Sequence, residues 1–287
     1  MKVLITGITG FVGRRLSKKL ADIGWVVAGL VRPSRKDEIE LLYEYDGTYA
    51  SVEKAIELFE PQAIIHLATT YTDNTSNSID SLASTNISLP LFLLEASKNS
   101  LVKVVFAGSY WQFGSQGESS PLDIYSASKA ATDKIIDYYS LRENVSASVL
   151  YFYGTYGSND GRGKVLDYIL QSIANGEKLR LSPGNQKLNL VHVDDIVSAI
   201  QLVLTNDDLT SGMAHKFGVY SRSSYSLKEI IAICQECFVP KVNVEFGAVP
   251  YRERELMEPQ YPHPTVPGWS ESVILKDFIK NLLAKKN

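Results

Sequence analysis

The chain has 287 residues, of which 45% are hydrophobic and 21% charged, and its formal net charge is −3. This length is enough for a buried core in one or two domains, and a slightly acidic chain has no electrostatic footprint for nucleic acid or an anionic membrane. No apolar run approaches the roughly 18 residues that span a bilayer, and the first apolar run breaks at Gly7, too early for a signal peptide. The chain has only two cysteines, which rules out a disulfide framework. We therefore expect a soluble cytoplasmic protein.

Short β-branched runs alternate with helical periods over the first two thirds of the chain. Strands are predicted over Lys2–Thr6, Trp25–Val31, Ala63–Leu67, Val102–Gly108 and Ser146–Tyr151. Helices are predicted over Val12–Ile23, Ser51–Glu60, Leu82–Lys98 and Tyr125–Arg142. Strands that alternate with helices form a parallel sheet covered on both faces. The predicted fold class is therefore α/β, a Rossmann-type doubly wound parallel sheet with a smaller C-terminal lobe.

The alternation weakens beyond Tyr151. A strand over Leu188–Val193 and a helix over Asp194–Leu204 are predicted to rejoin the sheet, and Asp194 or Asp195 is the expected N-cap of that helix. The expected division is a Rossmann domain over residues 1–153, rejoined by about 188–206, and a lobe over residues 154–187 and 207–287.

The two cysteines occur close together, in Cys234-Gln-Glu-Cys237. The surrounding segment has the period of an amphipathic helix, with Ser226 and Glu229 as its capping box. A zinc or redox site would need a second ligand pair or an exposed thiol context, and neither is visible. No metal site is expected.

Three glycines follow the first predicted strand in VLITGITGFVG. Gly7, Gly10 and Gly13 lie where the strand gives way to a helix, and this spacing lets the backbone turn tightly and approach a pyrophosphate at the helix N-terminus. The context predicts a dinucleotide site, although a tight turn that binds nothing is the alternative. The other predicted cofactor contacts are Thr9, Phe11, Val12, Leu67 and Ala68.

The second predicted strand ends in Val31-Arg32, with Arg35 just beyond. An NAD site usually has an acidic residue here, which binds the ribose 2′-hydroxyl. A carboxylate would repel a 2′-phosphate, whereas a guanidinium binds one through paired, charge-assisted hydrogen bonds. The sequence therefore predicts NADP(H), and the alternative is that Arg32 is a solvated arginine without a ligand.

Tyr125 and Lys129 are four residues apart in YSASK, so they share one face of the predicted helix. A free phenol, with a pKa of about 10, is a poor acid–base group at neutrality, and a cation one helical turn away favours the phenolate. We therefore expect Lys129 to lower the pKa of Tyr125. Ser109, at the end of the fourth predicted strand, strengthens the prediction of a catalytic site.

These motifs, together with IIHLA (64–68), Thr85-Asn86 and the segments 176–195 and 267–269, resemble the extended short-chain dehydrogenase/reductase family. The resemblance is to its sugar-nucleotide epimerase, dehydratase and reductase branch, and within it to the bacterial synthases of CDP-linked dideoxyhexoses. It covers nearly the whole chain and implies that hydride passes between a nicotinamide and a sugar carbon in deoxysugar and O-antigen biosynthesis.

The resemblance also implies the roles of single residues. Tyr125 would be the acid/base, Lys129 would bind the nicotinamide ribose and tune Tyr125, and Ser109 would hydrogen-bond the sugar oxygen. Asn86 corresponds to the family's helix asparagine near the active site and is expected at the substrate. Asp46 and Gly47 fall where the family contacts adenine.

Tyr110 and Trp111 directly follow Ser109. The 4,6-dehydratases of the family have an Asp-Glu pair at these two places, and aromatic side chains have no carboxyl group for that elimination. Dehydration is therefore disfavoured. The rings are expected to pack on a sugar face or to shield the hydride from water, and core filling is their alternative role.

Because the acid after the second strand is missing, we expect NADPH-dependent reduction of the 4-keto group of a nucleotide-activated deoxysugar, CDP-linked or otherwise. At two positions where the family usually has Arg and Asn, this chain has Tyr151 and Gly154. At the position of the Arg in the family's RDFVHV motif, it has Leu188. Other cations must therefore bind the diphosphate. The expected substrate contacts are Thr70, Asn86, Ser109, Tyr110, Trp111, Tyr153, Gly154, Arg162, Lys187 and Arg252. The cations in this set are Arg162, Lys187 and Arg252, and residues of this kind are more often ordinary surface charges than ligands.

Two alternatives stay open, a nucleotide-sugar 4-epimerase on the same scaffold and a catalytically silent NADPH-binding sensor. The intact Ser109, Tyr125 and Lys129 argue against the sensor, because a binding protein needs no proton donor. The helices that carry Asn86 and Tyr125 are expected to pair with their symmetry mates in a homodimer. The apolar residues that motivate this four-helix interface are Leu89, Leu91, Phe92, Ile135 and Tyr139.

Overall fold

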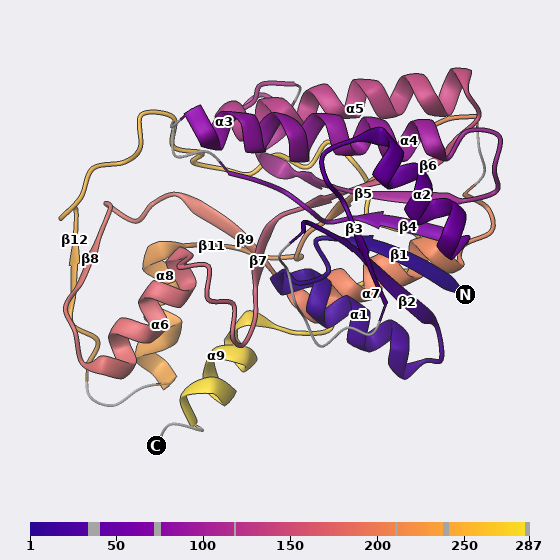
Figure 1. Ribbon diagram of the computed structural model, residues 1–287. Coiled ribbons are helices and arrows are strands. Elements are labelled where there is room, and N and C mark those ends of the chain that lie inside the picture. The colour runs from indigo at the N-terminus through magenta and orange to yellow at the C-terminus, as the bar shows by residue number, and fades with distance from the viewer. Residues whose placement is uncertain (34–40, 72–75, 118, 210–211, 238–240, 285–287) are drawn as a thin grey trace.

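The computed structural model describes residues 1–33, 41–71, 76–117, 119–209, 212–237 and 241–284, which Figure 1 shows as a ribbon. Seven strands form one parallel sheet in the order β10-β6-β5-β4-β1-β2-β3. They are β1 (Lys2–Thr6), β2 (Val26–Val31), β3 (Leu42–Glu44), β4 (Ala63–His66), β5 (Lys103–Ser109), β6 (Ser146–Phe152) and β10 (His215–Val219). The order turns back between β1 and β4, and open α/β sheets bind ligands at such a point, beyond the carboxyl ends of the strands.

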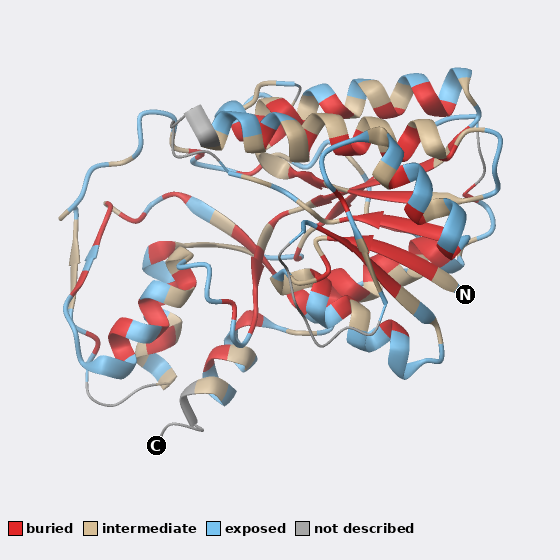
Figure 2. Ribbon diagram, in the orientation of Figure 1, coloured by how far each residue is buried: buried red, intermediate tan, exposed pale blue. Residues whose placement is uncertain are grey.

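Helices cover both faces of this sheet, because successive side chains along each strand point to opposite faces. In β1, Val3 and Ile5 belong to the core under one set of helices, and Leu4 belongs to the core under the other set. The first set is α1 (Phe11–Asp22) and α7 (Val193–Thr205), and the second is α2 (Tyr49–Phe59), α4 (Leu89–Ala96) and α5 (Ile124–Arg142). Figure 2 shows the strands buried and the outer helix faces exposed, so the predicted doubly wound fold is confirmed.

The helix predicted over Leu82–Lys98 consists of several pieces. α3 (Ser76–Ala83) leads into a π-helical turn over Ser84–Ser88, and α4 follows with Pro90 in its first turn. A π-helical turn inside a helix often marks a functional site. This turn carries Asn86.

The smaller lobe has its own core and two small sheets. Its strands are β7 (Gly154–Tyr156), β8 (Leu179–Leu181), β9 (Lys187–His192), β11 (Ser224–Ser226) and β12 (Val244–Phe246). β9 lies between β7 and β11, and β8 pairs with β12. The helices α6 (Val165–Asn175), α8 (Leu227–Cys237) and α9 (Leu275–Ala284) pack against these strands through one apolar cluster.

The prediction that the strand near residues 188–193 rejoins the main sheet was wrong. β9 pairs in parallel with β7 and antiparallel with β11, whereas β10 adds to the edge of the main sheet beside β6. The helix that follows, α7, does pack on the main sheet, as predicted. The chain therefore places a lobe strand and a Rossmann helix next to each other in sequence.

The predicted N-cap of α7 was also wrong. The His192 side chain accepts a hydrogen bond from the Asp194 amide at 3.3 Å, so His192 is the cap. Asp195, 1% exposed, instead accepts hydrogen bonds from the amides of Ser272 and Val273 and from the Ser272 hydroxyl. The carboxylate thus ties the C-terminal segment to α7.

The capping box at the start of α8 is confirmed. The Ser226 amide donates to Glu229 at 2.7 Å, and the Glu229 amide donates to the Ser226 hydroxyl at 3.2 Å. Cys234 is buried in the lobe core, and burial raises the pKa of its thiol to about 12. These two cysteines belong to a packed helix.

The apolar residues expected at a dimer interface also contribute to the core of this chain, and the dimer itself stays a prediction. Leu89 and Tyr139 are buried, and Leu91, Phe92 and Ile135 pack against the same core. The exposed apolar side chains of α5 are Ile124, Tyr138 and Leu141, which are 50%, 54% and 65% exposed. Across the described residues, no helix is long and apolar enough to cross a membrane.

Candidate active site

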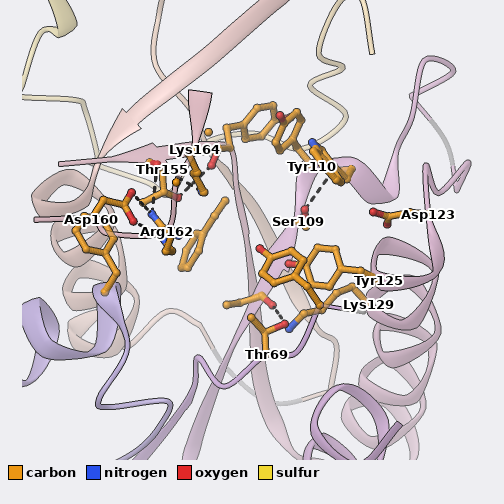
Figure 3. A pocket seen from close by; sticks show the side chains of 18 of the residues that line it. Thr69, Ser109, Tyr110, Asp123, Tyr125, Lys129, Thr155, Asp160, Arg162 and Lys164 are labelled. Atoms are coloured by element: carbon orange, nitrogen blue, oxygen red, sulfur yellow. Dashed lines mark hydrogen bonds and ion pairs between the residues drawn. The ribbon is translucent and has the colours of Figure 1, made fainter. Parts of the chain in front are cut away.

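A cavity of about 1740 Å³ opens at the carboxyl ends of the parallel strands and extends into the lobe. Its walls include the glycine turn after β1, the end of β5, the first turns of α5 and the lobe strand β8. Figure 3 shows the part of the cavity where Ser109, Tyr125 and Lys129 come together, with Arg162 and Lys164 on the lobe side. Reactive groups and lobe cations therefore share one space.

The glycine turn has no room for side chains. Gly7 has φ +71°, and a Cβ on it would lie 2.5 Å from the Ala68 amide nitrogen. A Cβ on Gly13 would lie 2.2 Å from the Gly7 carbonyl oxygen. The bare turn leaves the backbone amides of the first turn of α1 open to an anion, which fits the pyrophosphate of a dinucleotide.

The other residues expected at the cofactor divide into three groups. Thr9, Phe11, Val12, Arg32, Leu67 and Ala68 line the cavity with the glycines, and Arg35 lies outside the described residues. Asp46 and Gly47 are not among the residues that line the cavity, and their expected contact with adenine stays a prediction. Hydrogen bonds from Thr48 hold the Asp46 carboxylate at 2.6 and 2.9 Å and lower its pKa, so that group serves the N-terminal turn of α2.

Ser109, Tyr125 and Lys129 meet at the base of the cavity. Ser109 is the last residue of β5, and Asp123 caps α5 by accepting a hydrogen bond from the Ser126 amide at 2.8 Å, which fixes the turn that carries Tyr125. Tyr125 is 7% exposed and Lys129 is 4% exposed. The Lys129 ammonium donates to the Ala107 carbonyl of β5 at 3.1 Å.

The expectation that Lys129 lowers the pKa of Tyr125 was wrong. Burial raises that pKa well above its usual value, and the neighbouring Tyr71 adds to the rise, while hydrogen bonds with Ser109 and Thr69 oppose it. Burial also lowers the pKa of Lys129 to about 8, against the attraction of Asp133. Desolvation is the largest cause of the rise, so Tyr125 is a protonated phenol at neutral pH.

Tyr71 is an aromatic neighbour that the sequence did not reveal. Its ring centroid lies 4.2 Å from that of Tyr125, and its side chain is 56% exposed at the cavity. It follows β4 by only a few residues, in a loop without a motif. The position of Tyr71 in the sequence could not have indicated its contact with Tyr125.

A buried network behind Ser109 was also missed. The Gln112 side chain accepts from the Ser109 amide at 2.8 Å and donates to Asp133 at 2.9 Å, and the Tyr151 hydroxyl donates to the same carboxylate oxygen at 2.6 Å. Burial raises the pKa of Asp133 to about 6. The spacing of Asp133 one helical turn after Lys129 is the signal that could have found it.

Tyr110 and Trp111 both line the cavity. Tyr110 stacks on Tyr153 with ring centroids 4.8 Å apart, and the Arg252 guanidinium lies 5.8 Å from the Trp111 ring. The positions after Ser109 thus present aromatic surface. Asp123 is a carboxylate on the same cavity wall, and its capping hydrogen bonds hold it at the start of α5.

Asn86 does not reach the cavity, which corrects its expected contact with substrate. It is 0% exposed, its side-chain oxygen accepts from the Thr70 amide at 3.0 Å, and its side-chain nitrogen donates to the Thr70 carbonyl and the Ser128 hydroxyl, each at 3.0 Å. Asn86 therefore ties the loop after β4 to α5. Thr70, Tyr153 and Gly154 line the cavity, and their contact with substrate stays a prediction.

The cations on the lobe side differ in their availability. Lys187 lines the cavity, but its ammonium pairs with Glu258 at 2.7 Å. Lys164 and Arg180 line it too, and neither was singled out from the sequence. Burial lowers the pKa of Lys164 to about 8, with the charge of Arg162 as the next cause.

Residues 3–215 match the NAD dependent epimerase/dehydratase family. The chain belongs to this family. The resemblance inferred from the glycine turn and the Tyr-Lys pair is thus confirmed. The family description itself names the nicotinamide cofactor that the bare glycine turn fits.

Curated relatives match over the whole chain. CDP-abequose synthase of Yersinia pseudotuberculosis is 30% identical, with 99% of this chain and 100% of that protein covered. CDP-abequose synthase of Salmonella muenchen is 27% identical, with 99% and 98% covered. The Escherichia coli dTDP-4-dehydro-6-deoxyglucose reductase is 24% identical, with 98% and 96% covered.

Solved structures share the fold. MoeE5 in complex with UDP-glucuronic acid and NAD superposes with a TM-score of 0.82 at 20% identity, with 100% of this chain and 99% of that chain covered. UDP-glucose 4-epimerase from Thermotoga maritima, with UDP-glucose, has a TM-score of 0.82 at 21% identity, with 99% and 98% covered. At these identities the likeness shows the fold alone.

Proposed function

We propose that this protein reduces the 4-keto group of a nucleotide-activated deoxysugar with NADPH. The observation that carries the proposal is the buried, protonated phenol of Tyr125 beside Ser109, followed by Tyr110 and Trp111. A reductase needs a group that holds a proton until the ketone accepts hydride, and a phenol of raised pKa does so at neutral pH. No carboxylate occupies the two positions after Ser109 to eliminate water.

Among the curated relatives, the synthases and the reductase match over nearly their whole length, whereas the solved UDP-glucose 4-epimerase of Thermotoga maritima, covered to 98%, shows that length alone does not separate a reductase from an epimerase. The CDP-abequose synthases and the dTDP-4-dehydro-6-deoxyglucose reductase match over at least 96% of their own lengths. A probable UDP-glucuronate 4-epimerase of Rhizobium meliloti matches over 67% of its length, and a dTDP-D-glucose 4,6-dehydratase of Dictyostelium discoideum over 56%. Substrates of the first group are therefore the first to test.

In this proposal the dinucleotide, when bound at the glycine turn, would supply the hydride for the carbonyl carbon. Ser109 donates a hydrogen bond to the ketone oxygen, and Tyr125 gives that oxygen its proton, so ketone, hydride and proton together become the alcohol. Lys129 binds the nicotinamide ribose. Asn86 and Gln112 hold the surrounding loops in position through their buried hydrogen bonds.

Arg32 supports NADPH over NADH. It is exposed, lines the cavity directly after β2 and stands where an NAD site has a carboxylate. The Arg32→Ala variant should therefore lose most of a preference for NADPH, by about tenfold or more in Kd ratio. Lys19→Ala, an exposed cation in the last turn of α1, is the matched control. Equal binding of both cofactors by the wild type would contradict this assignment.

Lys164, Arg180 and Arg252 are the lobe cations that we assign to the substrate diphosphate. All three line the cavity. Lys187, with its ammonium held by Glu258, is less available for this role. A cation beside a diphosphate gains charge-assisted hydrogen bonds, so loss of one of them should raise KM more than it lowers kcat.

The deciding experiment is incubation with NADPH and a panel of 4-keto sugar nucleotides, with the NADPH absorbance and the sugar product followed together. We expect one NADPH consumed per sugar reduced. Tyr125→Phe should bind NADPH yet lose several orders of magnitude in rate, and Ser109→Ala about 10²-fold.

The two alternative functions give different results in the same assay. An epimerase would equilibrate two sugars without net loss of NADPH, and a sensor would bind NADPH without converting any sugar. Product that forms without NADPH oxidation, or a Tyr125→Phe variant at full rate, overturns the reductase proposal.

A further inference from the structure

Arg162 belongs to the loop between β7 and α6, yet its side chain reaches the opposite side of the cavity. The guanidinium carbon lies 4.5 Å from the centroid of the Phe11 ring. Phe11 is the first residue of α1, directly after its N-cap, Gly10. The amides of this helix turn are the groups that the bare glycine turn leaves open to a pyrophosphate. Arg162 therefore lies beside the cofactor end of the cavity.

The backbone is shaped for this contact. A Cβ on Gly157 would lie 3.1 Å from the Phe11 ring and 2.8 Å from the Val193 side chain, so only a glycine lets the lobe chain pass this close to α1. The first turn of α1 carries no acidic side chain. An anion at this turn would meet backbone amides and a cation.

One carboxylate orients the guanidinium and leaves part of it free. The Asp160 side chain, 1% exposed, accepts from Arg162 Nε and, at 2.6 Å, from Nη2. Nη2 also donates to the Thr155 carbonyl at 3.4 Å, whereas Nη1 has no partner within the described parts of the chain. Figure 3 shows this pair, with Lys164 close by. A guanidinium fixed on one edge by a carboxylate can bind an anion with its other edge.

We propose that Arg162 binds the pyrophosphate of the dinucleotide and not the diphosphate of the sugar nucleotide. Arg162 then links the bound cofactor to the loop over residues 157–164, which also carries Lys164 for the substrate. The proposal replaces the expectation that Arg162 contacts substrate. It rests on the dinucleotide site of the proposed function but not on the direction of the reaction, so a reductase and an epimerase would both show it.

The test is the affinity of Arg162→Met for NADPH and for NADH, measured by isothermal titration calorimetry. Because both cofactors contain the pyrophosphate, we expect both Kd values to rise by the same factor, about tenfold. Arg32→Ala should raise the Kd of NADPH alone. Lys178→Met, an exposed lobe lysine that pairs with Glu245, is the control and should leave both values within about twofold.

Arg162→Lys keeps the test decisive should Arg162→Met fail to fold. Lysine retains the charge but not the planar fork, so it should give an intermediate rise for both cofactors. Unchanged cofactor affinities in a folded variant overturn the proposal. Weaker binding of CDP or UDP with unchanged NADPH affinity overturns it as well and assigns Arg162 to the substrate.

Hydrogen exchange tests the coupling to the loop without any turnover. Saturating NADPH should slow exchange of the backbone amides over residues 157–164 in the wild type. The same cofactor at saturation should leave these amides unprotected in Arg162→Met. Equal protection in both proteins would refute the coupling, whatever sugar the enzyme uses.

Discussion

Replacement of Asp133 by asparagine isolates the charge of the network behind Ser109. Gln112 and Tyr151 both donate to one oxygen of the carboxylate. An asparagine with its side-chain oxygen at that place accepts the same two hydrogen bonds. The substitution therefore removes a buried charge while it keeps shape and hydrogen bonds.

The magnitude follows from the pKa of Asp133. Burial raises that pKa from 3.8 to about 6, against the hydrogen bond from Tyr151 and the attraction of Lys216. The folded chain thus binds more protons than the unfolded chain between these pH values. Stability from the neutral carboxyl is complete below pH 3.8 and is lost as the pH rises through about 6. The whole loss is about 3 kcal/mol, of which about 1.4 kcal/mol falls between about pH 5 and about pH 7.5.

The assay is urea unfolding of the wild type and Asp133→Asn across this pH range. The free energy of unfolding of the variant should gain on that of the wild type by about 1.4 kcal/mol as the pH rises from about 5 to about 7.5. Asp207→Asn, whose carboxylate is 100% exposed, is the control and should show no such trend. A constant difference between Asp133→Asn and the wild type would refute the reasoning.

The same substitution should act on Lys129. The Asp133 charge raises the pKa of Lys129 against its burial, so its removal lowers that pKa below about 8. If the ammonium binds the cofactor ribose, the alkaline limb of the NADPH oxidation rate moves to lower pH. An unshifted pH profile in a stable variant would separate Lys129 from this network.

Two further outcomes are expected. Asp195→Ala removes the acceptor of the Ser272 and Val273 amides and should lower the free energy of unfolding by about 2–5 kcal/mol. Thermal unfolding should then show a lower Tm while the affinity for NADPH is retained. Loss of activity at an unchanged Tm would instead indicate a catalytic role for Asp195. Two copies of the chain should associate through the exposed apolar face of α5. Light scattering should therefore find a dimer, and Leu141→Glu should convert it to a monomer. A monomeric wild type at micromolar concentration would contradict this.

Local patterns of the sequence determined much of the Rossmann half. β1, β4, β5 and β6 lie within a residue or two of their predicted bounds, because continuous apolar runs bounded by turns are typical of buried parallel strands. The glycine turn and the shared face of Tyr125 and Lys129 were predictable from the local spacing of residues. Each depends on spacing within one turn or one helix.

Only the tertiary structure decided which strands joined the main sheet and which groups met in the cavity. Nothing local to β9 and β10 distinguishes a lobe strand from a sheet-edge strand, since pairing depends on partners far along the chain. The contacts of Gln112 with Asp133 and of Arg162 with Phe11 likewise join distant segments. The sign of the Tyr125 pKa shift was decided there too, because the desolvation that raises it comes from packing of the whole chain, while the spacing to Lys129 records only a neighbouring charge.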